Sequence, residues 1–205
     1  RYWGGGGSRA NWNATANTNW SATSGGANNA SVPGSTDDVF FDGVGTFAQN
    51  NATLSASITI QSLNMTGYTG TTTQGNNVVL TIGGNGVVCK IQSTWNGNAT
   101  GQTIVFTGTS GTNLYTPPPA GTGIRDTQQN GARGTTQLQA ALSNSDRLLI
   151  DRGTFDTNGF TVTLTDRLDN TTVGTNTRVL TMGSSTINCA DRINLTSTNF
   201  TITAN

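Results

Sequence analysis

Two short sequence patterns recur in this chain at intervals of about 20 to 25 residues, and this periodicity constrains the fold more than any other feature. The tripeptide DRL occupies residues 146–148 and 166–168, and DRI occupies residues 191–193. Segments that alternate apolar residues with Thr recur beside them; these are FTVT at 160–163, LTMG at 180–183, FTIT at 200–203, ITI at 58–60 and LTIG at 80–83. In an extended strand, this alternation places apolar side chains on one face and Thr on the other.

A repeat of this length predicts a parallel β-solenoid, in which coils of about 20–25 residues stack at the strand spacing of about 4.8 Å. One coil cannot bury its own apolar face, whereas a stack of coils can. We therefore expect an all-β protein with a right-handed parallel β-solenoid over residues 44–205. The aligned repeats predict two inner columns, which are Phe160–Leu180–Phe200 and Val162–Met182–Ile202.

An antiparallel arrangement is the alternative. The turn sequence DTNG at 156–159 lies between two strand-like segments, and Asn-Gly turns are typical of β-hairpins. Successive hairpins would give an antiparallel β-sandwich or jelly roll. Hairpins do not require equal spacing, however, so the recurring interval favours the solenoid.

The composition agrees with an all-β fold and argues against two kinds of partner. Thr, Gly, Asn and Ser make up 105 of the 205 residues, and the helix formers Glu and Lys are represented by Lys90 alone. The ten acidic residues balance the ten basic residues, so we expect no nucleic-acid partner. Because no apolar run approaches the roughly 20 residues of a membrane-spanning helix, we expect no membrane span.

The middle of the chain interrupts the pattern. It contains three consecutive prolines at 117–119 and little apolar alternation, and proline cannot donate a hydrogen bond to a β-ladder. We therefore predict a Pro/Gly-rich excursion from the stack at 107–137. Long loops on rigid scaffolds often carry function, but a simple spacer explains this composition equally well.

The start of the chain is rich in aromatic residues. The sequence RYWGGGGSRANWNATANTNW contains Trp3, Trp12 and Trp20, and VFF follows at 39–41. The end of a solenoid exposes unpaired strands and an open core, which large side chains can cover. We therefore predict a Trp-rich N-terminal cap at 1–43.

The same rings also suggest a binding site. Aromatic faces suit sugar rings as well as protein cores, so we take Trp3, Trp12, Trp20 and Tyr115 as candidate contacts for a glycan or a partner. The cap remains the preferred interpretation of the three Trp residues, because large apolar rings are usually buried.

The opening segment also resembles a known group of proteins. RYWGGGGSRANWN…NWSATSGGANNASVPGSTDDVFFD, at residues 1–42, is similar to the RYWVGG…W…SGG…ASVP…D-x-V-x-FD start of Thr/Gly/Asn-rich repeat proteins of tailed phages and bacterial surfaces. GTFDTNGFTVT at 153–163 and RVLTMGSSTI at 178–187 resemble their repeats. Gly4 stands where those proteins usually have Val. The resemblance implies a parallel β-solenoid and a structural role on a virion or cell surface, and it supplies no catalytic residues.

Few residues offer catalytic chemistry. The chain has no His and no Glu, which excludes Ser-His-Asp and Cys-His arrangements and leaves Asp alone for carboxylate pairs. Asp residues gather in two groups, which are Asp37, Asp38 and Asp42, and Asp146, Asp151, Asp156, Asp166 and Asp169. Asp side chains on adjacent coils can hydrolyse glycans, but the Asp-Arg steps of the repeat are better explained by exposed ion pairs. We therefore predict no enzymatic activity, no catalytic residue and no cofactor.

We also predict no metal site. Cys89 and Cys189 stand a hundred residues apart, and without His a zinc site would lack most of its usual ligands. We interpret both as small apolar residues, although the sequence leaves a disulfide open. The STDD sequence at 35–38 lacks the spacing of an EF-hand calcium loop.

These observations predict a non-enzymatic structural module of a virion (tail, fibre or capsid decoration) or of a cell-surface filament, located outside the cell or on the virion. The alternatives are a glycan-binding adhesin or receptor-binding fibre, and a solenoid glycan lyase or hydrolase. Partners would be other virion or surface proteins and surface glycans. Because TNFTITAN at 198–205 offers no cap for the last coil, we expect this coil to be covered by further residues of the chain, by a second subunit or by a neighbouring virion protein. A homo-oligomer is the preferred arrangement, with a trimer as the first to test.

Overall fold

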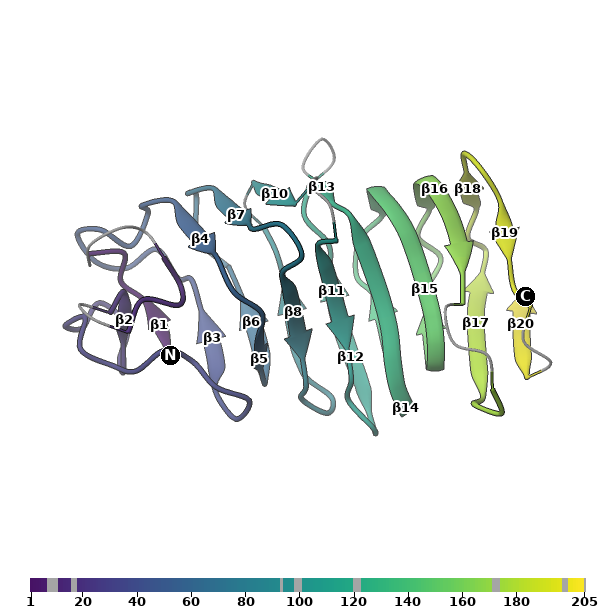
Figure 1. Ribbon diagram of the computed structural model, residues 1–205, viewed down its shortest axis with the longest axis horizontal. Helices are drawn as coiled ribbons and strands as arrows, with labels where there is room; N and C mark the ends of the chain where they lie inside the picture. Colours follow the sequence, from purple (N-terminus) through teal and green to yellow (C-terminus); the bar gives the residue numbers. More distant parts are fainter. Residues whose placement is uncertain are drawn as a thin grey trace.

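The protein is an elongated stack of short strands, with the N-terminus at one end and the C-terminus at the other (Figure 1). This computed structural model describes residues 1–6, 11–15, 18–92, 94–97, 101–119, 123–170, 174–196 and 199–204. The regular elements of these residues are all strands, which confirms the all-β prediction. None of the described residues belongs to a helix that is long and apolar enough to cross a membrane.

The strands form about seven coils, and the stacked strands make three faces. The first face contains β4 (Ala52–Leu54), β7 (Thr72–Gln74), β10 (Trp95–Gly97), β13 (Gly123–Ile124) and β18 (Ile187–Cys189). The second face contains β5 (Ile58–Ile60), β8 (Val79–Ile82), β11 (Thr103–Phe106) and β19 (Ile193–Asn194). The third face contains β3 (Asp38–Phe40), β6 (Ser62–Asn64), β9 (Val88–Lys90), β12 (Thr112–Thr116), β17 (Arg178–Gly183) and β20 (Phe200–Ala204).

Three long strands turn corners and so belong to more than one face; they are β14 (Asp126–Leu138), β15 (Leu142–Asp156) and β16 (Val162–Asp169). The register of β15 with β14 and with β16 shifts along its length, as expected where a strand bends around a corner. Each coil therefore continues across its corners without leaving the stack.

Neighbouring coils pair in parallel, and the DRL repeat predicts their register correctly. The copies align residue for residue, in the pairs Arg147–Arg167, Leu148–Leu168 and Leu168–Ile193. The ITI and LTIG copies align in the same way, in the pairs Ile58–Leu80 and Ile60–Ile82. Within the described residues, the one antiparallel pair joins β1 (Tyr2–Trp3) and β2 (Trp20–Ser21). The β-solenoid is therefore confirmed, and the antiparallel sandwich is excluded.

The FTVT, LTMG and FTIT copies, in contrast, do not align as predicted. Leu180 pairs with Phe155 on one side and with Ile202 on the other. Phe160 lies outside the strands, where its backbone N–H donates to the carbonyl of Thr157 across a turn. The predicted columns Phe160–Leu180–Phe200 and Val162–Met182–Ile202 are therefore wrong. Coils differ in length at their corners, so equal spacing in sequence does not give equal register.

The predicted excursion at 107–137 is also wrong for the residues that the structure describes there. β12 and most of β14 fall in this range, and they pair in parallel with each other, with β9 and with β15. Polar residues at inner positions of β14 hid the strand pattern. Thr136 Oγ1 donates to Gln129 Oε1 at 2.6 Å, and Gln129 Nε2 donates to the carbonyl of Gly131 at 3.3 Å. Residues 120–122, which also belong to the predicted excursion, lie outside the described residues.

Glycine permits close stacking where the second face turns into the third. A Cβ on Gly131 would lie 1.8 Å from the carbonyl oxygen of Gly108 in the preceding coil. A Cβ on Gly153 would lie 2.1 Å from the carbonyl oxygen of Gly131, and Gly153 has a φ of 73°, which L-residues rarely adopt. A larger residue at this corner would push neighbouring coils apart.

The core runs along the axis of the stack as columns of aligned side chains. One column on the third face consists of Val39, Leu63, Cys89, Tyr115 and Leu138, all fully buried. Each coil adds one member to the column, so burial depends on the neighbours above and below. The two ends of the stack therefore present the same problem, namely how to cover a core that has a neighbour on one side only.

Candidate functional site

The N-terminal cap is an aromatic cluster built around Phe41. The centroid of the Phe41 ring lies 5.2 Å from that of Trp3, 5.0 Å from that of Trp12 and 5.7 Å from that of Trp20, within the range of favourable aromatic pairs. Trp12 also lies 6.5 Å from Trp95 of β10. The three N-terminal Trp residues are at most 1% exposed, so the cluster closes the core at this end.

Backbone hydrogen bonds attach the cap to the first coil. β1 pairs in parallel with β3 on the third face, and Asn11 forms a parallel bridge with Thr53 on the first face. The backbone N–H of Trp12 donates to the carbonyl of Thr53 at 2.9 Å, and Trp20 Nε1 donates to the carbonyl of Trp12 at 2.8 Å. The Trp-rich cap is therefore confirmed. Its boundary at residue 43 stays a prediction, and residues 7–10 and 16–17 within it lie outside the described residues.

The structure places the predicted glycan contacts in the core. Trp3, Trp12, Trp20 and Tyr115 are each at most 1% exposed, so none offers an open ring face at the surface. Trp3 nevertheless contributes to the lining of a pocket in the cap. Tyr115 packs on Phe106, with ring centroids 4.9 Å apart, and burial raises the pKa of its hydroxyl well above the usual value. This burial corrects the prediction that a sugar stacks on these four rings. The sequence shows the rings but not the side chains from distant coils that cover them.

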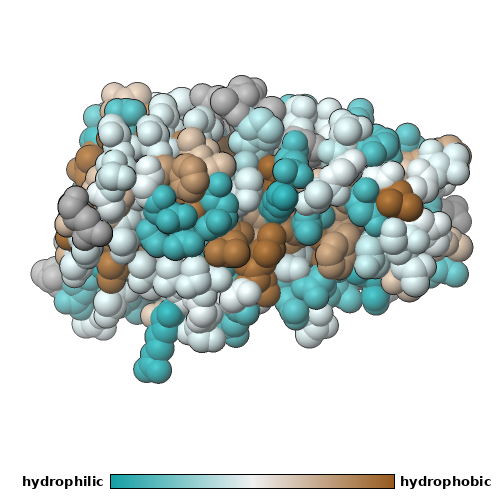
Figure 2. Space-filling view, turned by 180° about the vertical axis from the view of Figure 1, so that it is seen from behind, coloured by the Kyte–Doolittle hydropathy of each residue, from teal (hydrophilic) through white to brown (hydrophobic). Residues whose placement is uncertain are grey.

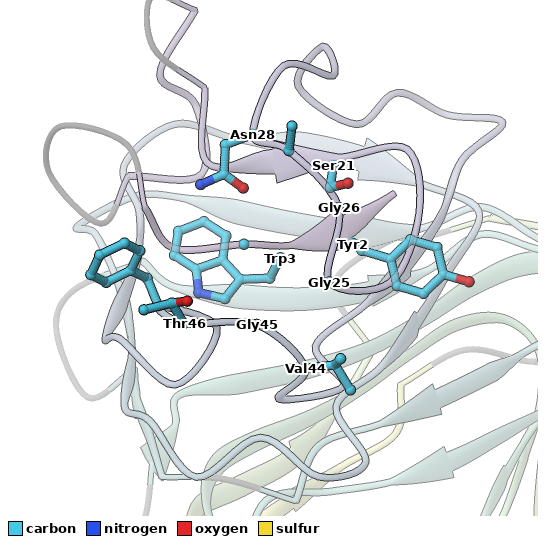
Figure 3. A pocket seen from close by; sticks show the side chains of 12 residues that line it. Tyr2, Trp3, Ser21, Gly25, Gly26, Asn28, Val44, Gly45 and Thr46 are labelled. Carbon is cyan, nitrogen blue, oxygen red and sulfur yellow. The ribbon is translucent and has the colours of Figure 1, made fainter.

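A pocket of about 210 Å³ opens beside the buried rings of the cap (Figure 3). It is formed by β1, by the turn after β2 at 25–28 and by the loop after β3 at 44–47. In Figure 3 the Trp3 ring lies between Asn28 on one side and Thr46 on the other. All of the described residues that line the pocket are uncharged.

Sequence reasoning missed the residues on the rim of this pocket. Val44 and Phe47 both line it, and both are 51% exposed. Single exposed apolar side chains are common, but these two lie together at one pocket, which makes the pocket a candidate binding site. The available signal was the segment GVGTF at 43–47, in which glycines precede two apolar residues that fit no strand pattern.

The DR repeat forms a ladder of ion pairs along the corner between the first and second faces. Arg147 Nε donates to Asp126 Oδ1 at 2.8 Å, and Arg147 Nη2 also donates to Asp126 Oδ2. The Asp126 carboxylate is almost fully buried, and its hydrogen bond raises the pKa of Arg147. At the other end of the ladder, Arg192 and Asp191 lie 3.7 Å apart and are both more than half exposed. The ladder therefore passes from a buried pair to an exposed one.

Other Asp side chains are held by structural hydrogen bonds. Gln128 Nε2 donates to Asp151 Oδ2 at 2.6 Å, and Gln137 Nε2 donates to Asp156 Oδ2 at 2.8 Å. These bonds join neighbouring coils. The described residues contain no group of three or more Cys and Asp side chains placed to hold a metal ion.

The last coil leaves two large apolar side chains exposed. Ile193 of β19 is 58% exposed and Ile202 of β20 is 52% exposed. In the described part of the chain, β20 pairs with β17 and with no strand on its other side. The edge of β20 therefore offers unpaired backbone groups beside uncovered apolar side chains.

The rest of the surface mixes polar and apolar residues. Seen from behind, residues of intermediate hydropathy cover most of the molecule, hydrophilic ones form separate patches, and apolar ones gather near the middle of the stack (Figure 2). A second cavity, of about 360 Å³, lies at the corner after β12 and is lined by the prolines at 117–119 together with Ile91. The proline segment thus shapes a groove on the stack.

No protein-family model, no curated protein and no solved structure matches this chain.

Proposed function

We propose that this protein is a non-enzymatic structural module of a virion or a cell surface. It acts as a rigid rod that is closed at its N-terminal end and makes a contact at its last coil. The observation that carries the proposal is the difference between the two ends. The Trp cluster is fully buried, whereas Ile193 and Ile202 are more than half exposed on a strand edge that is ready to pair.

The side-chain chemistry supports a structural role. Several Asp side chains of the second half form ion pairs and hydrogen bonds between coils, such as Asp126 with Arg147 and Asp156 with Gln137. Spread over successive coils, such bonds stiffen a stack along its axis. The resemblance of residues 1–42 to the start of phage and bacterial surface proteins supports the same location.

The partner that we propose for the last coil is a second copy of this chain. Solenoid ends are covered by caps or by neighbouring subunits, and closed symmetric homo-oligomers are the commonest assemblies. A trimer is the arrangement to test first. Association would bury the apolar side chains of β19 and β20 and give their unpaired backbone groups a partner.

Light scattering and sedimentation of the 1–205 chain test this proposal. We expect an oligomer whose mass falls to that of a monomer in the variant Ile202→Asp, because a charge at the contact is costly to bury. Val88→Asp on β9 is the matched control, since Val88 is an exposed apolar residue far from the last coil, and it should leave the oligomer intact. A monomer at all concentrations, with slow amide exchange at 199–203, would overturn the proposal.

A further inference from the structure

The pocket of the cap carries an inference that goes beyond the structural role. Figure 3 shows that β1, the turn after β2 and the loop after β3 meet around it. These segments are far apart in the sequence, and only the folded cap brings them together. The volume of about 210 Å³ lies below the roughly 300–1,000 Å³ of clefts that hold drug-sized ligands. It suits a ligand of a single ring.

The loop that carries Val44 and Phe47 is fixed by its own hydrogen bonds. Asp42 Oδ1 accepts from the backbone N–H of Val44 at 3.0 Å, and the carbonyl of Phe47 accepts from the backbone N–H of Asn50 at 2.9 Å. Asn50 Nδ2 donates in turn to the carbonyl of Gly5 at 3.1 Å, which ties the loop to the segment that follows β1. The two apolar side chains are therefore held at the rim before any ligand arrives, which lowers the entropic cost of binding.

Opposite this loop, the Asn28 side chain is available to a ligand. A Cβ on Gly4 would lie 1.7 Å from Asn28 Oδ1, so the lack of a side chain at Gly4 is what admits this amide. Asn28 makes no side-chain hydrogen bond with the described part of the chain. Its amide offers two donors and one acceptor, a pattern that matches vicinal hydroxyl groups.

We propose that this pocket binds one ring of a neutral carbohydrate. The C–H face of the sugar would lie on Phe47 and Val44, and its hydroxyl groups would bond with the Asn28 amide. No charged side chain is present among the described lining residues to hold an anion. A purely apolar ligand would desolvate the Asn28 amide without giving it a partner, at a cost in affinity. A sugar ring, apolar on its face and polar on its edge, meets both conditions.

Saturation-transfer nuclear magnetic resonance with the methyl glycosides of glucose, galactose, mannose and N-acetylglucosamine tests this site in the 1–205 chain. We expect at least one of them to bind with a Kd of about 1 mM, the order expected for so small a ligand. Phe47→Ala and Asn28→Ala should each weaken binding about tenfold or more. Gly4→Val should abolish it by displacing Asn28. The fluorescence of the buried Trp residues reports whether each variant is folded.

Two matched variants serve as controls. Asn29 is the exposed neighbour of Asn28 and does not line the pocket, and Leu114 is exposed on the third face. Asn29→Ala and Leu114→Ala should therefore leave the Kd unchanged. The site is excluded if none of the four glycosides binds, if the pocket variants bind as the controls do, or if methyl glucuronide binds better than the neutral sugars. None of these results bears on the oligomer at the last coil, which scattering measures separately.

Discussion

The two ends of the stack are built from the same kind of coil but are covered in different ways. At the N-terminal end, Trp12 and Trp20 are 0% exposed, and they fill the space beyond the first coil. At the other end, Ile193 and Ile202 remain 58% and 52% exposed. The difference teaches that a coil of this solenoid does not complete its own core. The core of an end coil is covered by what lies beyond that coil. At the N-terminal end this is the aromatic cluster of the cap, and at the other end none of the described residues covers the core.

This difference implies that stability is uneven along the rod. In a stack where each coil contacts only its neighbours, a coil with one neighbour is expected to open more readily than one with two. The half of the stack next to the cap, called here the capped half, contains the aromatic cluster. The last coil should therefore open locally while the capped half remains folded. Four measurements test this comparison.

The largest contrast is expected between the two cysteine thiols. Cys89 is fully buried in the capped half and Cys189 is partly exposed in the last coil. Burial raises the pKa of both thiols, so both react slowly, but Cys189 needs only a local opening. For a domain with a free energy of unfolding of about 5–15 kcal/mol, labelling of Cys89 through global unfolding should be slower by a factor of about 1,000 or more.

Mass spectrometry of Cys89→Ser and Cys189→Ser, each with one remaining thiol and treated with iodoacetamide, measures the two rates. Equal rates would mean that the capped half opens as easily as the last coil, and the comparison would fail. If a second copy covers the last coil, labelling of Cys189 should also slow as the protein concentration rises.

The second contrast lies between large side chains at the two ends. Trp20→Ala removes a fully buried ring and its hydrogen bond to Trp12, so we expect the free energy of unfolding to fall by about 3–5 kcal/mol. Ile202→Ala removes a half-exposed side chain and should cost less than about 1 kcal/mol. Urea titration measures both. If Trp20→Ala does not fold, Trp20→Phe should still have a lower free energy of unfolding than the natural protein. Equal losses of this free energy in Trp20→Phe and Ile202→Ala would contradict the conclusion that the Trp cluster closes the core.

The capped end also shows what the sequence could predict. The capping role of the Trp residues could be predicted from their large side chains and their place before the first repeat, because the core is open at the start of a repeat array. The sequence could not show which rings are accessible to a ligand, because the burial of Trp3 depends on Phe41 and on a loop more than 40 residues away. The pocket of the cap could not be predicted from the sequence for the same reason. Its rim residues become neighbours only through the fold.

Register was predictable where polar and apolar residues repeat together. DRL fixes a charged pair and an inner Leu in one motif, so its copies align correctly, as Leu148 with Leu168. The apolar–Thr motif repeats only a strand pattern that any face can carry. Aligning the copies of this motif matched Leu180 to Phe160, although Leu180 pairs with Phe155 in the neighbouring coil. β14 was missed because inner positions such as Gln129 are polar and are satisfied by other side chains, which a pattern of hydrophobicity does not reveal.

The third contrast runs along the ion-pair ladder, from its buried pair to its exposed one. Arg147→Ala leaves the Asp126 carboxylate buried without its partner. We expect a loss of about 2 kcal/mol, below the 3–5 kcal/mol typical of fully buried pairs, because Arg147 is 24% exposed. Arg192→Ala breaks a pair that is more than half exposed and should cost less than about 0.5 kcal/mol. Urea titration at neutral pH compares them, and equal losses would show that the ladder is uniform.

The smallest effect is expected from alkali, and it should again concern the capped half. Burial raises the pKa of Tyr68 to about 12, whereas an unfolded Tyr ionises near pH 10. The folded state thus favours the neutral hydroxyl, which donates to the carbonyl of Asn50 at 2.8 Å. The stability that this preference contributes is fully present below pH 10 and is lost as the pH rises from 10 towards 12.

Tyr68→Phe isolates this contribution. The variant should be slightly less stable at pH 8, because it lacks the hydrogen bond to Asn50, by about 1 kcal/mol. Between pH 10 and 11.5 the stability of the variant should fall less steeply than that of the natural protein. The fall that remains reflects other buried groups of the same half, such as Cys89 and Tyr115, whose pKa values are also raised. Urea midpoints at a series of pH values measure both slopes. Parallel slopes would mean that Tyr68 ionises in the folded protein as readily as in the unfolded chain, and that the capped half is more open to water than its burial indicates.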